Sequence, residues 1–128
     1  MGILVANMEK FHLYRPEWTA MWYSYAPTGF TARRNFGAAA SRNGFRVAGG
    51  SSAGMLRAMQ RYDTTSSNWI DVCLPAEACN MTFTPADNFP MVADPTNDLL
   101  AFGGNDGALP LSAIQAWDFQ AASWSVPA

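Results

Sequence analysis

The stretch RVAGGSSAGMLRAMQRYDTTSSNWIDV, residues 46–72, holds a double glycine, a tyrosine–aspartate pair and a tryptophan in a fixed order. The same order returns later in the chain, where a second double glycine precedes Trp117, Asp118 and Trp124. In both places seven positions separate the aromatic residue from the tryptophan, and the double glycines lie 54 positions apart. A self-similar period of about 50 residues indicates a repeat architecture whose unit is a small group of strands.

Each part of this pattern has a physical role in such a unit. The apolar runs before the double glycines, residues 45–48 and 99–102, predict buried strands, and the glycines predict turns with positive φ. Alternating segments at residues 55–63 and 112–118 predict the next strand, which ends where an aspartate accepts turn amides. A tryptophan then opens the last strand and packs between neighbouring units. The residues that carry the pattern are Gly49, Gly50, Tyr62, Asp63, Trp69, Gly103, Gly104, Trp117, Asp118 and Trp124.

An Asn43-Gly44 hairpin signal precedes the first apolar run and supplies the remaining strand pair. The full order of arginine, small-residue strand, turn, hydrophobic strand, double glycine, aromatic–aspartate and tryptophan resembles the kelch repeat. The resemblance covers residues 33–72 well, and residues 90–126 moderately, because the strand PMVA is short and Trp117 replaces the usual tyrosine.

The resemblance implies an all-β chain: a kelch-type β-propeller fragment of two to three four-stranded blades, completed by oligomerisation or by docking. The alternative is an unrelated β-sandwich that carries the same spacings. We expect residues 1–32 to form strands of a degenerate blade or an N-terminal arm. Residues 33–73 and 90–128 form the two kelch-like blades, and residues 74–89 form an inserted loop.

Residues 25–32 are expected to be a second inserted loop. Long connections in such folds commonly carry contacts with partners. The candidate interaction residues are aromatic side chains in or beside these loops: Trp22, Tyr23, Tyr25, Phe83 and Phe89.

Composition favours a covered surface. Charged residues make up 14% of the chain, against roughly 25% in ordinary soluble domains. Seven arginines accompany a single lysine, a bias typical of protein interfaces, although a genomic preference for arginine explains it equally well. The net charge is −2 without blocks of like charge, so neither nucleic acid nor a membrane is an expected partner. No signal peptide or membrane span is visible, and we expect synthesis in the cytoplasm.

Enzyme chemistry finds little support in the sequence. His12 is the only histidine, so there is no second imidazole for a metal site and no recognisable triad. Copper radical oxidases share the kelch-like fold but need paired histidines, so their activity is not implied. Cys73 and Cys79 have no zinc-site spacing, and free thiols are preferred over a local disulfide. We therefore expect a protein that is not an enzyme, with no catalytic residue, cofactor or metal.

Several aspartates lie in turn contexts, including Asp94, Asp98 and Asp106. Turn formation is a more frequent role than calcium binding for such residues. The segment NDG at residues 105–107 is the best candidate for a weak metal or polar-ligand loop.

Two or three blades cannot close a propeller ring, which needs 4 to 8, so apolar faces must be covered by something else. The first hypothesis is a structural assembly protein that binds copies of itself or other proteins, for example in a bacteriophage particle. The second is a lectin-like module that binds carbohydrate after assembly. The third is an intracellular adaptor for a protein or peptide. Sugar-stacking candidates for the second hypothesis are Trp22, Trp69, Trp117 and Trp124.

Overall fold

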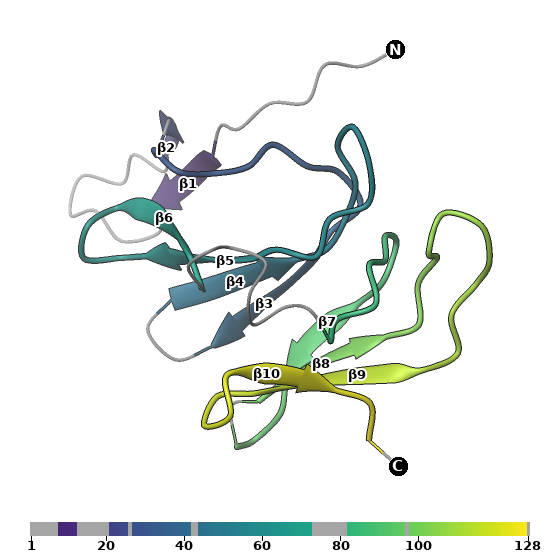
Figure 1. Ribbon diagram of the computed structural model, residues 1–128. Helices are drawn as coiled ribbons and strands as arrows, with labels where there is room; N and C mark the ends of the chain where they lie inside the picture. Colours follow the sequence, from purple (N-terminus) through teal and green to yellow (C-terminus); the bar gives the residue numbers. More distant parts are fainter. Residues whose placement is uncertain are drawn as a thin grey trace.

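The regular elements of the computed structural model are all β-strands within the part of the chain that it describes. They form a two-stranded sheet and two four-stranded antiparallel sheets (Figure 1). The expectation of an all-β chain is therefore confirmed. None of the described residues belongs to a helix of the length and hydropathy needed to cross a membrane. The described residues are 8–12, 21–25, 27–41, 44–72, 82–96 and 98–127.

Both larger sheets are meanders in which each strand pairs with the next one in the sequence. The first sheet contains β3 (Gly37–Ser41), β4 (Gly44–Ala48), β5 (Met59–Asp63) and β6 (Asn68–Asp71). The second sheet contains β7 (Met91–Ala93), β8 (Leu99–Phe102), β9 (Ile114–Asp118) and β10 (Ser123–Ser125). The two-stranded sheet is formed by β1 (Met8–His12) and β2 (Met21–Tyr25).

The double glycines end β4 and β8 as the sequence predicts. Gly49 and Gly50 have φ values of 60° and 80°, and Gly103 and Gly104 have φ values of 62° and 98°. A side chain is disfavoured in this left-handed region, so glycine lets the chain leave the strand without steric cost.

The aspartates at the ends of β5 and β9 also behave as predicted. Asp63 accepts hydrogen bonds from the backbone amides of Thr65 and Ser66, both at 3.3 Å. Asp118 accepts from the amides of Gln120 and Ala121 at 2.7 and 3.0 Å. Each carboxylate thus satisfies the amides of the turn that leads to the fourth strand.

The strand predicted at residues 55–63 begins later than the sequence pattern indicates. Met55 forms an isolated bridge with Ser51, and the amide of Leu56 donates to the carbonyl of Gly50. The chain therefore folds back after the double glycine before it enters β5 at Met59. The strand predicted at residues 112–118 is shortened in the same way, because the amide of Leu111 donates to Gly104.

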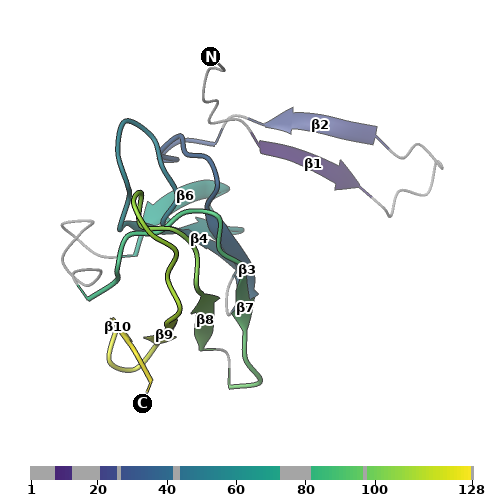
Figure 2. The same ribbon diagram turned by 90° about the vertical axis from the view of Figure 1, so that its right-hand side faces the viewer.

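The two sheets are in direct contact. Their first strands, β3 and β7, lie side by side (Figure 2). Side chains alternate along the strands, so each sheet has two faces. We call the face of the first sheet that packs on the second sheet its trailing face, and the face of the second sheet that packs on the first its leading face; the opposite faces take the other name. The trailing face of the first sheet carries Ala48 and Met59, opposite each other on β4 and β5. The leading face of the second sheet carries Trp117 and Trp124, opposite each other on β9 and β10.

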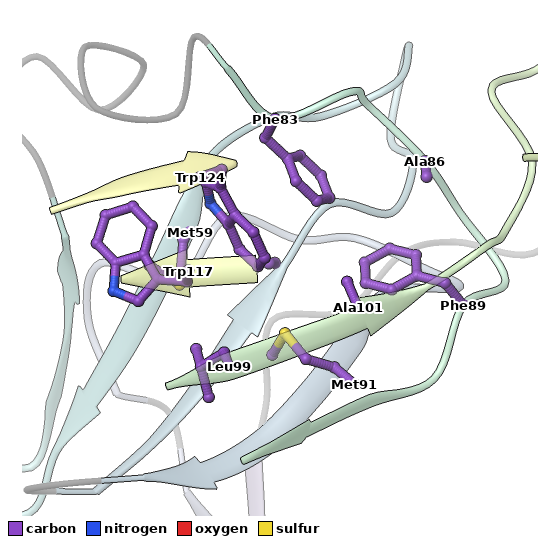
Figure 3. Close-up of a cluster of buried hydrophobic side chains, with 10 residues drawn as sticks. Met59, Phe83, Ala86, Phe89, Met91, Leu99, Ala101, Trp117 and Trp124 are labelled. Atoms are coloured by element: carbon purple, nitrogen blue, oxygen red, sulfur yellow. The ribbon is translucent and has the colours of Figure 1, made fainter. Parts of the chain in front are cut away.

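Buried side chains from these two faces form one cluster (Figure 3). Met59 and Ala48 come from the first sheet, and the rest come from the second sheet and the segment that precedes it. A smaller cluster lies on the leading face of the first sheet, around Val47, Tyr62 and Trp69. The main core is therefore the contact between the sheets rather than the inside of either one.

Candidate interaction faces

The two sheets repeat each other at the level of single side chains. Trp69 lies 4.7 Å from Phe30 at an interplanar angle of 42°, and Trp124 lies 4.7 Å from Phe83 at 44°. The internal repeat therefore includes an aromatic residue upstream of the first strand of each sheet.

The aromatic pairs across the last two strands correspond just as closely. The rings of Tyr62 and Trp69 are 5.5 Å apart at 61°, and those of Trp117 and Trp124 are 5.7 Å apart at 62°. Edge-on packing of this kind places one large apolar wedge on the leading face of each sheet.

The upstream segment is itself repeated, and we call it the entry segment: residues 30–36, FTARRNF, before the first sheet and residues 83–89, FTPADNF, before the second. Asn35 and Asn88 hold the same place in it, with positive φ values of 56° and 55°. Residues 74–81 of the loop expected at 74–89 lie outside the described residues. The described remainder contains the second entry segment, and the loop expected at 25–32 overlaps the first.

A buried glutamine fixes each entry segment to its sheet. Gln60 Oε1 accepts a hydrogen bond from the amide of Thr31 at 3.0 Å, and Gln115 Oε1 accepts from the amide of Thr84 at 2.6 Å. Gln115 Nε2 also donates to the carbonyl of Thr84 at 3.2 Å. Both glutamines lie two residues before the aromatic–aspartate pair. This signal is visible in the sequence, but it is not part of the pattern of glycines and tryptophans that defines the repeat.

The entry segment also pairs with the loop after the double glycine. Arg34 and Ser51 exchange two backbone hydrogen bonds of 3.0 Å, and Asp87 and Asn105 exchange two of 2.9 Å. Each entry segment therefore belongs to the unit that follows it in the sequence.

In the first unit, Arg33 adds a buried guanidinium to this arrangement. Its Nη1 donates to the carbonyls of Gly49 and Ala58 at 3.0 and 2.9 Å, and its Nη2 donates to Gln60 Oε1 at 3.1 Å. These acceptors compensate the desolvation of the charge. The second unit has Ala86 at the corresponding position, where it is buried in the main cluster.

The second entry segment also joins the two sheets. The amide of Asn88 donates to the carbonyl of Asn35 at 2.8 Å, and the amide of Gly50 donates to the carbonyl of Ala86 at 2.8 Å. The ring of Phe89 occupies the space above two glycines of the first sheet. A Cβ added at Gly37 would clash with this ring, and one added at Gly49 would lie 2.9 Å from it.

An arginine on the trailing face of the first sheet packs against the second unit. The guanidinium of Arg46 lies 4.4 Å from the centre of the Phe119 ring. Burial, with the nearby charge of Arg61 as a smaller cause, lowers the pKa of Arg46 to about 10. Arg46 stays protonated near neutral pH, so this contact is a cation–π interaction across the junction.

The trailing face of the second sheet has no such cover within the described residues. Ala48 and Met59 of the first sheet are 0% exposed, whereas their counterparts Phe102 and Ile114 are 36% and 43% exposed. Val92, on the same face, is 45% exposed. These side chains form an apolar patch on the outer side of β7, β8 and β9, and this patch is the candidate interaction face.

The sequence-predicted candidates lie elsewhere. Phe83 and Phe89 are buried where the two sheets meet, so they hold the units together inside the chain. Trp69, Trp117 and Trp124 are buried in the two apolar clusters. The side chains of Trp22, Tyr23, Tyr25 and His12 lie outside the described part of the chain, as do Cys73 and Cys79.

The turn aspartates use their oxygens locally. Asp106 accepts from the amides of Ala108 and Leu109 at 2.9 and 2.8 Å, and the Leu109 amide is the main cause that lowers the pKa of Asp106. Asp94 accepts from the amides of Thr96 and Asp98 at 2.8 and 3.0 Å. Among the residues described by the structure, no three or more histidine, cysteine, aspartate or glutamate side chains are grouped to hold a metal ion.

No protein-family model matches the chain, and no curated protein matches its sequence. The resemblance to kelch repeats therefore stays a prediction that depends on the pattern of residues and on the geometry described above.

Proposed function

We propose that the protein is a non-enzymatic assembly component, made of kelch-type β-propeller blades, that binds protein surfaces through the open trailing face of its second sheet. The observation that carries the proposal is the difference between two equivalent faces. The trailing face of the first sheet is buried under the second sheet, whereas Phe102 and Ile114 on the trailing face of the second are exposed. A contiguous exposed apolar patch is typical of an interaction site.

The chemistry of this face supports a protein partner. Leu100 and Ala116 stand where the first sheet has Arg46 and Arg61, so the exposed face carries fewer charges than the buried one. A loss of charge at the centre of a patch is the composition expected of an interface core.

Carbohydrate binding has weaker support. A sugar stacks on an exposed aromatic ring, and the rings of Trp69, Trp117 and Trp124 are buried in apolar clusters. The adaptor hypothesis placed its contacts on the loop at 74–89, whose described aromatic residues, Phe83 and Phe89, are used inside the chain. Assembly through the sheet face is therefore the preferred function, and a bacteriophage particle stays a prediction for its setting.

Photo-crosslinking in the natural source of the protein tests this function. A photoreactive residue at Ile114 samples the open face, and one at Thr64, in the exposed turn after β5, is the matched control. We expect adducts with protein from position 114 and few from position 64. Equal yields at both positions, or no protein adduct at position 114, would contradict the proposed function.

A further inference from the structure

We infer that the open trailing face is covered by a second copy of this chain, docked head to tail through the contact that joins the two sheets internally. The inference rests on the proposed function and deepens it by naming the partner. It follows from the repeat: the first unit carries the counterparts of the residues that bind a trailing face, and the second unit carries a trailing face that no described residue covers.

The internal junction defines what such a contact needs. The second unit supplies Phe89, which lies over Gly49, and it supplies the amide of Asn88, which donates to Asn35. The first unit supplies the trailing face and the amide of Gly50, which donates to Ala86. A head-to-tail copy would repeat these roles with the corresponding residues of the other unit.

The first unit carries an exposed aromatic side chain equivalent to Phe89. Phe36 is the counterpart of Phe89 in the entry segment, and it is 37% exposed where Phe89 is 5% exposed. Phe36 keeps the local contacts of its counterpart, since its Cβ lies beside Gly50 as the Cβ of Phe89 lies beside Gly104. The local structure that orients the ring is therefore present before any partner binds.

The second unit has free space at the glycine equivalent to the one under the Phe89 ring. A Cβ added at Gly103 would meet only the carbonyl oxygen of Leu111 within 4 Å, whereas one at the equivalent Gly49 would meet Ala86 and the Phe89 ring. The space that Phe89 fills above the first sheet is thus unfilled above the second within the described residues. Pro90 stands where the first sheet has Gly37, so the second sheet repeats only Gly103 of the two glycines under the ring, and the ring of Phe36 would lie over Gly103 and not over Pro90.

Among the described residues, two backbone amides, one in each unit, lack the backbone acceptor that their counterparts have at the internal junction. Within the described part of the chain, the amide of Gly104 donates to no backbone acceptor, although its counterpart Gly50 donates across the junction. The amide of Asn35 likewise has no backbone acceptor there, although its counterpart Asn88 does. A second copy offers Asn35 the carbonyl of Asn88, which repeats the internal hydrogen bond.

A contact between two different faces has a consequence that a symmetric one lacks. The interface is heterologous, so copies add in one direction until the ring closes. A variant with a damaged trailing face still has an intact leading side, and a variant with a damaged leading side still has an intact trailing face. When the two variants are mixed, the intact surface of one can bind the intact surface of the other. Only one such contact can form, so the mixture gives a dimer and no larger oligomer.

The test is sedimentation velocity on purified protein with the variants Phe102→Asp, on the trailing face, and Phe36→Asp, on the entry segment. A charge placed at the centre of an apolar contact weakens association at least about tenfold. We expect the wild type to form a discrete oligomer, each variant alone to be monomeric, and their equimolar mixture to form a dimer of one copy of each.

Other results would overturn the inference. If Phe102→Asp is monomeric but Phe36→Asp still associates, the trailing faces meet each other. If the mixture stays monomeric, the two faces do not bind one another. A monomeric wild type, together with a crosslink from position 114 to a different protein, removes the second copy and leaves the proposed function standing. A monomeric wild type without any protein crosslink removes both.

Folding is controlled in the same samples. Circular dichroism establishes that each variant keeps its β-structure. Where Phe102→Asp fails to fold, Ile114→Glu replaces it, because Ile114 is exposed on the same trailing face. Where Phe36→Asp fails to fold, Ala38→Arg replaces it, because Ala38 is exposed on the leading face of the first sheet.

Discussion

The backbone amide of Asn88 donates a 2.8 Å hydrogen bond to the carbonyl of Asn35, the residue that holds the same position one repeat earlier. Both residues have φ near the left-handed region, 55° and 56°. At this position of the repeat, the carbonyl of the first unit accepts from the following unit, and the amide of the second unit donates to the preceding one. A junction built this way can be repeated by any further unit of the same kind.

Phe89→Ala should destabilise the fold strongly, because it removes a ring buried against Gly37 and Gly49. We expect a loss of about 3 kcal/mol in the free energy of unfolding. Phe36→Ala, its counterpart in the repeat, should cost about 1 kcal/mol or less in dilute protein, since Phe36 is already partly in water. Urea unfolding at low protein concentration compares the two. Equal losses would mean that Phe89 does not join the sheets.

Gly49→Ala should be damaging for two reasons. Gly49 has φ of 60°, and an added Cβ would lie 2.7 Å from the carbonyl oxygen of Ala86. We expect a cost of at least about 2 kcal/mol. Gly54→Ala is the matched control, because nothing lies within 4 Å of its added Cβ. Thermal unfolding should show Gly54→Ala to be neutral or slightly stabilising, and a harmless Gly49→Ala would argue against the junction geometry.

Gln115→Ala should loosen the second entry segment from its sheet. The side chain is buried and exchanges two hydrogen bonds with the backbone of Thr84. Their loss should cost about 1–2 kcal/mol. Gln120→Ala, in the exposed turn after β9, should stay within about 0.5 kcal/mol of the wild type. Hydrogen exchange at the Thr84 amide provides a local readout, and unchanged protection in Gln115→Ala would count against the assignment.

Asp63 should make stability depend on pH. The hydroxyl of Ser66, helped by the Thr65 and Ser66 amides, lowers the pKa of Asp63 below its ordinary 3.8. A lowered carboxyl pKa in the folded state stabilises the fold above 3.8, and this contribution is lost as the pH falls through the folded value. Asp63→Asn should therefore be less stable than the wild type at neutral pH and converge with it in acid. A gap that stays constant with pH would contradict the expectation.

Ser66→Ala provides the control for that titration. Without the hydroxyl donor, the pKa of Asp63 should move back toward its ordinary value while the carboxylate itself is retained. Carbon-detected NMR of the carboxyl group measures this shift directly.

Local chemistry made much of the fold predictable. The double glycines and the turn aspartates act within a few residues of themselves, so their spacing located the ends of β4, β5, β8 and β9. The starts of β5 and β9 were less predictable. The alternating apolar pattern continues back to Met55, and only the bridge between Met55 and Ser51 reveals that this part of the chain turns instead.

The interaction face was not predictable from the sequence in the same way. Phe89 is a large apolar residue in a long connection, which makes it look like a surface contact; its burial depends on two glycines in another sheet. Phe102 and Ile114 look like ordinary core residues of β8 and β9. They are exposed because no described residue covers the trailing face of the second sheet.

The native mass of the purified wild-type chain, measured by light scattering on a size-exclusion column, tests the central claim most directly. Head-to-tail contact between copies predicts one discrete species whose mass is a small multiple of the 13.9 kDa chain. Dilution should convert this species to the monomer. A well-folded monomer of 13.9 kDa at the highest soluble concentration would contradict the claim that a second copy covers the open face.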